Sequence, residues 1–244
     1  MGNITSSNKK NIKKKNQKKN TEKDKCVYIL ISKTGTWPSQ VIKMWTKEPY
    51  AHTSLAFDIE LNEMYSFARK KLRNPFNCGF IYEDITKGVF GRDVNTVCKV
   101  MRLWLTSVQY KKLVRNIDKF KENKSFYKYN YIGIFGIMFG KAVERKYNYF
   151  CSQFVAYVLQ KSGVDLFNKK PGLVRPEDFR VCPYLETVYE GRLNKYRDYL
   201  SQNIPKDKKT GKYIEEPGKY LFRAECDDIE IPEVAIAKEE KSYQ

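Results

Sequence analysis

The chain has 244 residues, of which 41% are hydrophobic and 14% aromatic, so it can form one globular domain of ordinary size and is not wholly disordered. No apolar run approaches the roughly 18–20 residues of a membrane-spanning helix. The net charge of +18 favours anionic partners such as lipid headgroups, nucleic acid or acidic polymers, without selecting one of them.

The cysteines and the histidine content argue against a metal centre. The chain has six widely spaced cysteines, no Cys-x-x-Cys pair and one histidine. Zinc sites usually show paired ligands at short spacing. We therefore expect reduced thiols in a cytoplasmic protein, with no metal and no cofactor.

The first 25 residues form a segment of their own. They contain nine lysines, two acidic residues and almost nothing apolar, which predicts a disordered basic arm. Met1 to Ser6 fit the M-G-x-x-x-[ST] pattern for N-myristoylation at Gly2 in a eukaryotic cell or host. An acyl chain followed by lysines would hold the protein at an anionic membrane surface as a peripheral protein. The arm is too polar for a secretory signal.

The following segments alternate between short apolar runs and turns. Strands are expected at 26–32, 50–58, 64–69, 79–82 and 97–106, with the second and third forming a hairpin. A short helix is expected at 37–46 and a loop at 74–77.

Helices dominate the later part of the chain. The sequence predicts helices at 108–123 with Ser107 as cap, at 149–162 ended by Gly163, and from 174–178 onwards. We interpret the apolar segment 131–140 as a buried helix. A domain over 26–200 would precede an irregular arm at 201–244 with one strand near 220–222. The expected fold class is α+β, an antiparallel sheet packed by helices.

Two segments carry residues suited to nucleophilic chemistry. His52, the sole histidine, lies at the start of a predicted strand, and any mechanism that needs imidazole must use it. Cys151 lies in the first turn of the predicted 149–162 helix, where the helix dipole and unpaired N–H groups favour a thiolate. A nucleophilic thiol at a helix start facing a histidine on a strand is the papain-type arrangement. Cys26 and Cys98 lie inside strand patterns and are interpreted as core residues.

These two segments resemble those of a known family in permuted order. Residues 50–58 resemble the histidine strand of the permuted NlpC-type (YiiX-like) papain-like cysteine amidases and peptidases, and residues 149–155 resemble their Cys-Ser-x-Phe-Val helix start. Residues 64–69, 74–76 and 79–80 are similar to a bacterial subgroup. The resemblance covers about residues 26–185 and implies a circularly permuted papain-like fold.

The resemblance also implies a third polar residue on the strand after the histidine. Hairpin geometry points to Ser66, with Glu63 and Glu60 as alternatives. It implies a cysteine hydrolase acting on an amide or ester bond through an acyl-enzyme, with a lipid or peptide as substrate.

Three further hypotheses stay open. One is a lipid-directed thiol acyltransferase, which the lecithin retinol acyltransferase family exemplifies. Another is an inactive, membrane-associated binding module of the same fold. The third is a nucleic-acid-binding protein, supported by charge and tyrosine content; against it, the aromatic residues lie in apolar patterns and no recognition motif is present.

Overall fold

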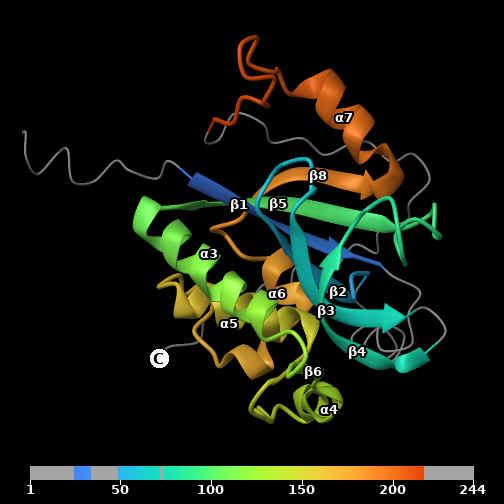
Figure 1. Cartoon of the computed structure of the whole chain (residues 1–244), viewed down its shortest axis with the longest axis vertical. Helices are drawn as coiled ribbons and strands as arrows, with labels where there is room; N and C mark the ends of the chain where they lie inside the picture. The colour runs from blue at the N-terminus through green and yellow to red at the C-terminus, as the bar shows by residue number, and fades with distance from the viewer. Residues whose placement is uncertain (1–24, 34–48, 72–73, 217–244) are drawn as a thin grey trace, which may run out of the picture.

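The computed structural model of the chain describes residues 25–33, 49–71 and 74–216 (Figure 1). The predicted basic arm up to residue 24 with Gly2, the helix at 37–46 and the strand near 220–222 lie outside the described residues.

The described chain is built on a six-stranded sheet in the order β4-β3-β2-β1-β5-β8, in which every neighbouring pair is antiparallel. The strands are β1 (Lys25–Ser32), β2 (His52–Ala56), β3 (Met64–Lys71), β4 (Asn74–Glu83), β5 (Val97–Leu105) and β8 (Glu186–Arg192). A second, two-stranded parallel sheet joins β6 (Lys128–Tyr129) and β7 (Asn148–Tyr149). The prediction of an antiparallel sheet packed by helices is confirmed.

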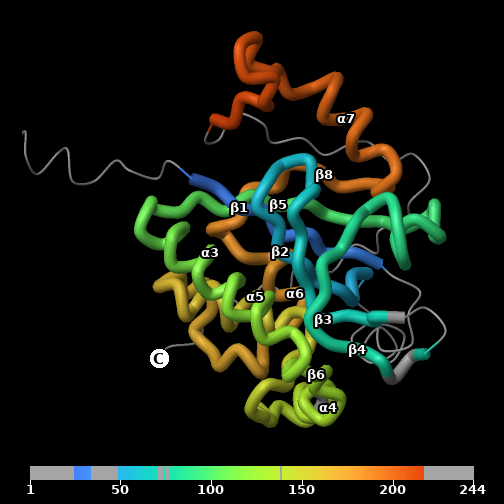
Figure 2. Tube along the Cα trace, viewed as in Figure 1, coloured from blue at the N-terminus to red at the C-terminus, as the bar shows by residue number. Residues whose placement is uncertain are grey.

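Helices cover both faces of the large sheet. Figures 1 and 2 show α3 (Ser107–Glu122), α5 (Cys151–Lys161) and α6 (Pro176–Arg180) on one side of it and α7 (Tyr196–Asn203) on the other. The central strand β1 alternates between two cores: Val27, Ile29 and Ile31 pack with α3 and α5, while Tyr28 and Leu30 pack with α7. Burial on both faces explains why β1 is an uninterrupted apolar run.

The α5 helix is formed as its sequence predicts. Phe150 is extended and precedes the first turn, and Phe154, Val155, Val158 and Leu159 form the buried face. Gly163 adopts φ of 82°, a left-handed conformation that ends the helix without a Cβ clash. Of the first two residues of the predicted range, Tyr149 belongs to β7 and Phe150 is the N-cap of α5.

Two local expectations were wrong, and one strand was missed. The cap of α3 is Thr106, not Ser107, because the Thr106 hydroxyl accepts from the Gln109 N–H at 3.2 Å and the Gln109 side chain returns the bond to the Thr106 N–H at 3.0 Å. Residues 74–77 begin β4 instead of forming a loop, because an edge strand tolerates the missing N–H of Pro75. The polar edge strand β8 was not predicted.

The apolar segment after β6 also differs from its prediction. It forms α4 (Tyr131–Met138), followed by the cap residue Phe139, as a helix. Ile134 is buried, but Ile132, Phe135 and Phe139 are exposed. The expected buried helix is therefore buried on one side alone.

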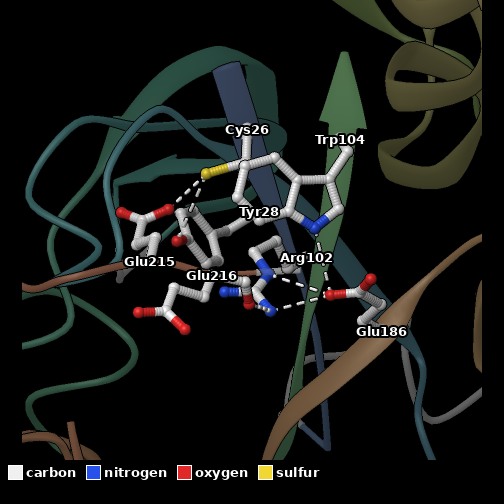
Figure 3. A network of polar contacts seen from close by, with 7 residues as sticks. All are labelled: Cys26, Tyr28, Arg102, Trp104, Glu186, Glu215 and Glu216. Carbon is white, nitrogen blue, oxygen red and sulfur yellow. Dashed lines mark hydrogen bonds and ion pairs between the residues drawn. The ribbon is translucent and has the colours of Figure 1, made fainter. Parts of the chain in front are cut away.

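The chain after α7 returns across β1 and β5 (Figure 3). The buried Arg102 donates to the Glu186 carboxylate at 2.7 Å and to the Glu216 carbonyl at 2.9 Å, and the Trp104 N–H shares Glu186 at 3.1 Å. The Cys26 thiol donates to Glu215. Residues 204–216, which fall in the predicted irregular arm, contain one isolated bridge and are tied to the sheet through these contacts. The short 3₁₀ helices Pro171–Leu173 and Leu193–Lys195 complete the described elements.

Candidate active site

The structure brings the two predicted catalytic residues together. His52 is the first residue of β2, where it pairs with Ser32 of β1, and Cys151 is the first residue of α5. The Cys151 thiol interacts with the His52 imidazole and contributes to its raised pKa. A hundred residues of sequence separate these two side chains, and the packing of α5 against β2 joins them.

A buried carboxylate contacts the imidazole at Nε2. Glu83, the last residue of β4, places Oε1 2.9 Å from His52 Nε2. Ser54, two residues beyond His52 on β2, donates its hydroxyl to Glu83 Oε2 and lies 3.2 Å from His52 Nε2. Both carboxylate oxygens of Glu83 are therefore engaged.

The protonation of this group follows from burial and charge. Burial by itself lowers the pKa of His52, but the Glu83 carboxylate and the Cys151 thiol outweigh it and raise the pKa to about 10. Burial likewise opposes ionisation of Glu83, yet His52 and the hydroxyls of Ser54 and Ser66 hold the pKa of that carboxyl below its usual value. The pair is therefore an imidazolium and a carboxylate at neutral pH.

Cys151 has a second polar neighbour in Tyr129, on β6. Burial, followed by the neighbouring Cys151, raises the pKa of the Tyr129 hydroxyl well above its ordinary value, so the group stays a neutral donor beside the sulfur. At the same place, the first N–H groups of α5 have no partner within the helix. Gln153 secures this end by accepting from the Phe150 N–H at 3.4 Å and from Asn130 Nδ2 at 3.2 Å.

The hydrogen bonds to His52 Nε2 come from Glu83 and Ser54 and not from the three sequence candidates for the third position. Ser66 is fully buried on β3 and its hydroxyl has no hydrogen bond of good geometry, although it faces Glu83 and favours its ionised form. Glu63 pairs with Lys121 at 3.3 Å, and Glu60 lies in the turn after β2. The side chains that contact His52 Nε2 are Glu83 and Ser54.

Glu83, Ser54 and Tyr129 were missed by the sequence reasoning. Ser54 could have been found from the sequence, because it lies two residues after His52 and alternate residues of a strand share one face. Glu83 ends an apolar run, but its closeness to His52 depends on the registers of β2 with β3 and of β3 with β4. Tyr129 gave no signal that distinguishes it from the other tyrosines.

The site is shielded from solvent. Cys151 is 2% exposed and His52 8%, and the Phe90 ring lies 6.2 Å from the His52 ring. Low exposure strengthens the electrostatic interactions among Cys151, His52 and Glu83, because less water screens them. Within residues 25–33, 49–71 and 74–216, no three His, Cys, Asp or Glu side chains gather as metal ligands.

Comparison with protein-family models and with curated proteins finds no match to this chain.

Proposed function

We propose that the chain is a cysteine hydrolase that acts on an amide or ester bond of an acyl substrate, on a circularly permuted papain-like fold. The observation that carries the proposal is the buried group of Cys151, His52 and Glu83, with the thiol at a helix start and the imidazole interacting with both the thiol and the carboxylate. Each residue type occupies the position that nucleophile, base and orienting group need.

The reaction would proceed in two halves. The reactive form is the ion pair of the Cys151 thiolate and the His52 imidazolium, in which the thiol proton has already been lost. The thiolate attacks the acyl carbon, forming a C–S bond while the carbonyl electrons move to oxygen. The N–H of Cys151 and the Tyr129 hydroxyl are donors that can stabilise this oxyanion. Collapse breaks the C–N or C–O bond, and the imidazolium gives its proton to the leaving amine or alcohol. Water then loses a proton to His52 and attacks the thioester, which releases the acid and Cys151.

Glu83 supplies a stronger third group than the hydroxyl expected from the sequence. A carboxylate at 2.9 Å from Nε2 fixes the ring and stabilises the imidazolium by charge. Ser54 in turn holds the carboxylate.

Transfer of the acyl group to an alcohol or amine is the second candidate. The exposure of Cys151, 2%, favours it, because a site closed to water protects a thioester from hydrolysis until an acceptor enters.

Other buried cysteines provide internal controls for a test. Cys78 and Cys182 are 8% and 7% exposed, and burial raises the pKa of both thiols. At about pH 6, where an ordinary cysteine is almost entirely protonated, iodoacetamide should alkylate Cys151 at least tenfold faster than Cys78 and Cys182 in peptide mapping. His52→Ala should remove that excess.

A second measurement tests the acyl-enzyme directly. Incubation with p-nitrophenyl esters should add one acyl group to the intact mass, located at Cys151 and absent in Cys151→Ser. The rate of acid release, with and without an added amine, separates hydrolysis from transfer. An inactive binding module would give Cys151 alkylation equal to that of Cys78 and Cys182 and no acyl adduct, and that result would overturn the proposal.

A further inference from the structure

The α4 helix and its cap carry a stripe of exposed apolar side chains. Ile132, Phe135 and Phe139 follow one another at spacings of three and four residues, which places them on one side of a helix. They are 52%, 49% and 70% exposed. Figure 1 shows α4 at one extremity of the molecule, away from the large sheet. We call these three residues the α4 stripe.

The opposite side of α4 packs against the rest of the domain, and this packing leaves the α4 stripe on the outer side of the helix. Ile134 is 5% exposed and belongs to the main core. A Cβ added at Gly133 would lie 2.4 Å from the Asn130 side chain, and one at Gly136 would lie 2.5 Å from the Lys141 carbonyl oxygen. These glycines allow a close approach that other residues would prevent, which sets the rotation of the helix.

The surroundings of the stripe are basic. Residues 124–147 contain five lysines or arginines and one acidic residue, and all six side chains are exposed. The five basic residues are Lys124, Lys128, Lys141, Arg145 and Lys146, and the acid is Glu144. Exposed Phe126 and Tyr147 lie in the same segment, with the Lys146 ammonium 5.0 Å from the centre of the Tyr147 ring.

We propose that the α4 stripe docks on the surface of an anionic lipid bilayer. Exposed apolar side chains with lysine and arginine around them match a surface that is apolar within and negatively charged at its headgroups. Among the helices of the described ranges, none is long and apolar enough to cross a membrane. In the proposed docking, the stripe would lie in the interfacial plane. This inference concerns residues other than the lysine-rich first 25, and it does not require the proposed chemistry.

A buried asparagine connects the docking helix to the candidate active site. Asn130 caps α4 by accepting from the Gly133 N–H at 3.0 Å, and its Nδ2 donates to Gln153 in the first turn of α5 at 3.2 Å. Tyr129, the preceding residue, interacts with Cys151. The docking helix and the N-terminus of α5 are therefore joined directly, and an acyl substrate taken from the bilayer would be a lipid.

Vesicle flotation of the full chain tests the proposal. The variant is Ile132→Ser with Phe135→Ser and Phe139→Ser, and the matched control is Val108→Ser, at a residue 62% exposed in the first turn of α3. Vesicles of phosphatidylcholine, with and without about one third phosphatidylserine, are compared at low salt and at about 0.5 M NaCl, which screens purely electrostatic binding.

The wild type and Val108→Ser should keep a salt-resistant bound fraction on the anionic vesicles. In the triple variant, this bound fraction should be at least tenfold lower. In addition, brominated lipids should quench a tryptophan introduced as Phe135→Trp but not one introduced as Val108→Trp. Equal salt-resistant binding by the triple variant and the wild type would overturn the proposal. So would a concentration-dependent dimer that the triple variant abolishes while vesicle binding persists. Iodoacetamide labelling of Cys151 in the triple variant reports separately on the proposed chemistry.

Discussion

His52 interacts with the Glu83 carboxylate and with the Cys151 thiol, and both raise its pKa. Glu83 is ionised and 2.9 Å away, and the Cys151 thiol interacts with the same ring. The raised pKa of His52 is therefore a direct measure of how the site is assembled.

The histidine can be titrated alone, because the chain has no other. In a ¹H–¹³C NMR titration the single imidazole Cε1 signal should have its midpoint well above the ordinary 6.5, towards about 10. Glu83→Gln removes the negative charge and should move the midpoint down by more than about one unit, a change of roughly 1.4 kcal/mol in interaction. Glu63→Gln should leave it unmoved. A wild-type midpoint at 6.5 would contradict the ion pair.

The same two pKa directions define a pH window for stability. The pKa of Glu83 is lowered in the folded state, so its contribution is present above about 4.5 and is lost as pH falls through the folded value. The pKa of His52 is raised, so its contribution is complete below 6.5 and is lost as pH rises towards about 10. Urea unfolding should show the largest difference between wild type and Glu83→Gln between these limits, and the difference should shrink at alkaline pH. A difference independent of pH would contradict the assignment.

At the scale of elements, the site depends on how the first turns of α4 and α5 are joined. Asn130 satisfies the α4 N-terminus, the Val143 carbonyl at 2.9 Å and Gln153 with one side chain.

Asn130→Ala should therefore lower the free energy of unfolding by about 2 kcal/mol and also slow alkylation of Cys151. Thr106→Ala, which removes the cap of α3, should cost about 1 kcal/mol without changing the alkylation rate. Chemical unfolding and peptide-mapped labelling measure the two effects. Equal labelling rates in both variants would show that the Asn130 link does not position the nucleophile.

Elements with a strong local pattern could be predicted from the sequence. The β1 strand is a pure apolar run, and α5 has a clear buried face and a terminating Gly163, so both elements and the position of Cys151 within α5 could be inferred. His52 could be named as a candidate catalytic base because the chain has no other histidine. The strand β8 has no such pattern, because it lies at the sheet edge with polar and apolar residues mixed.

The rest of the site depends on contacts between distant segments. Met64 pairs with both Ala56 and Glu83, which puts Glu83 on the same face of the sheet as Ser54 and His52, and the sequence does not state these registers. Likewise, the exposure of Ile132, Phe135 and Phe139 depends on where α4 packs, since its composition alone fits a buried helix.

At the scale of the whole molecule, the chain after α7 is bound to the sheet at Arg102. This guanidinium is 1% exposed and fully dependent on its partners for compensation of its charge. Because an unpaired buried charge is costly, Arg102 must keep these partners. Its contact with Glu186 ties β5 to β8, and its contact with the Glu216 carbonyl ties β5 to residue 216.

Glu186→Ala should destabilise the protein by about 3 kcal/mol or more, since it leaves Arg102 with a carbonyl partner but no counter-charge. Glu63→Ala, which breaks the half-exposed pair with Lys121, should cost about 1 kcal/mol or less. Thermal or urea unfolding measures both. A similar, small effect of the two substitutions would show that Arg102 finds another anionic partner.

The registers that place Glu83 have one more consequence. A slip of one residue between β3 and β4 would turn the Glu83 side chain to the opposite face of the sheet, because strand side chains alternate. The carboxylate would then leave the imidazole, although the hairpin would still be fully hydrogen-bonded. The single histidine resonance is thus a built-in reporter of correct strand pairing, and a refolded sample with a mis-registered hairpin would show a second signal near the ordinary titration midpoint.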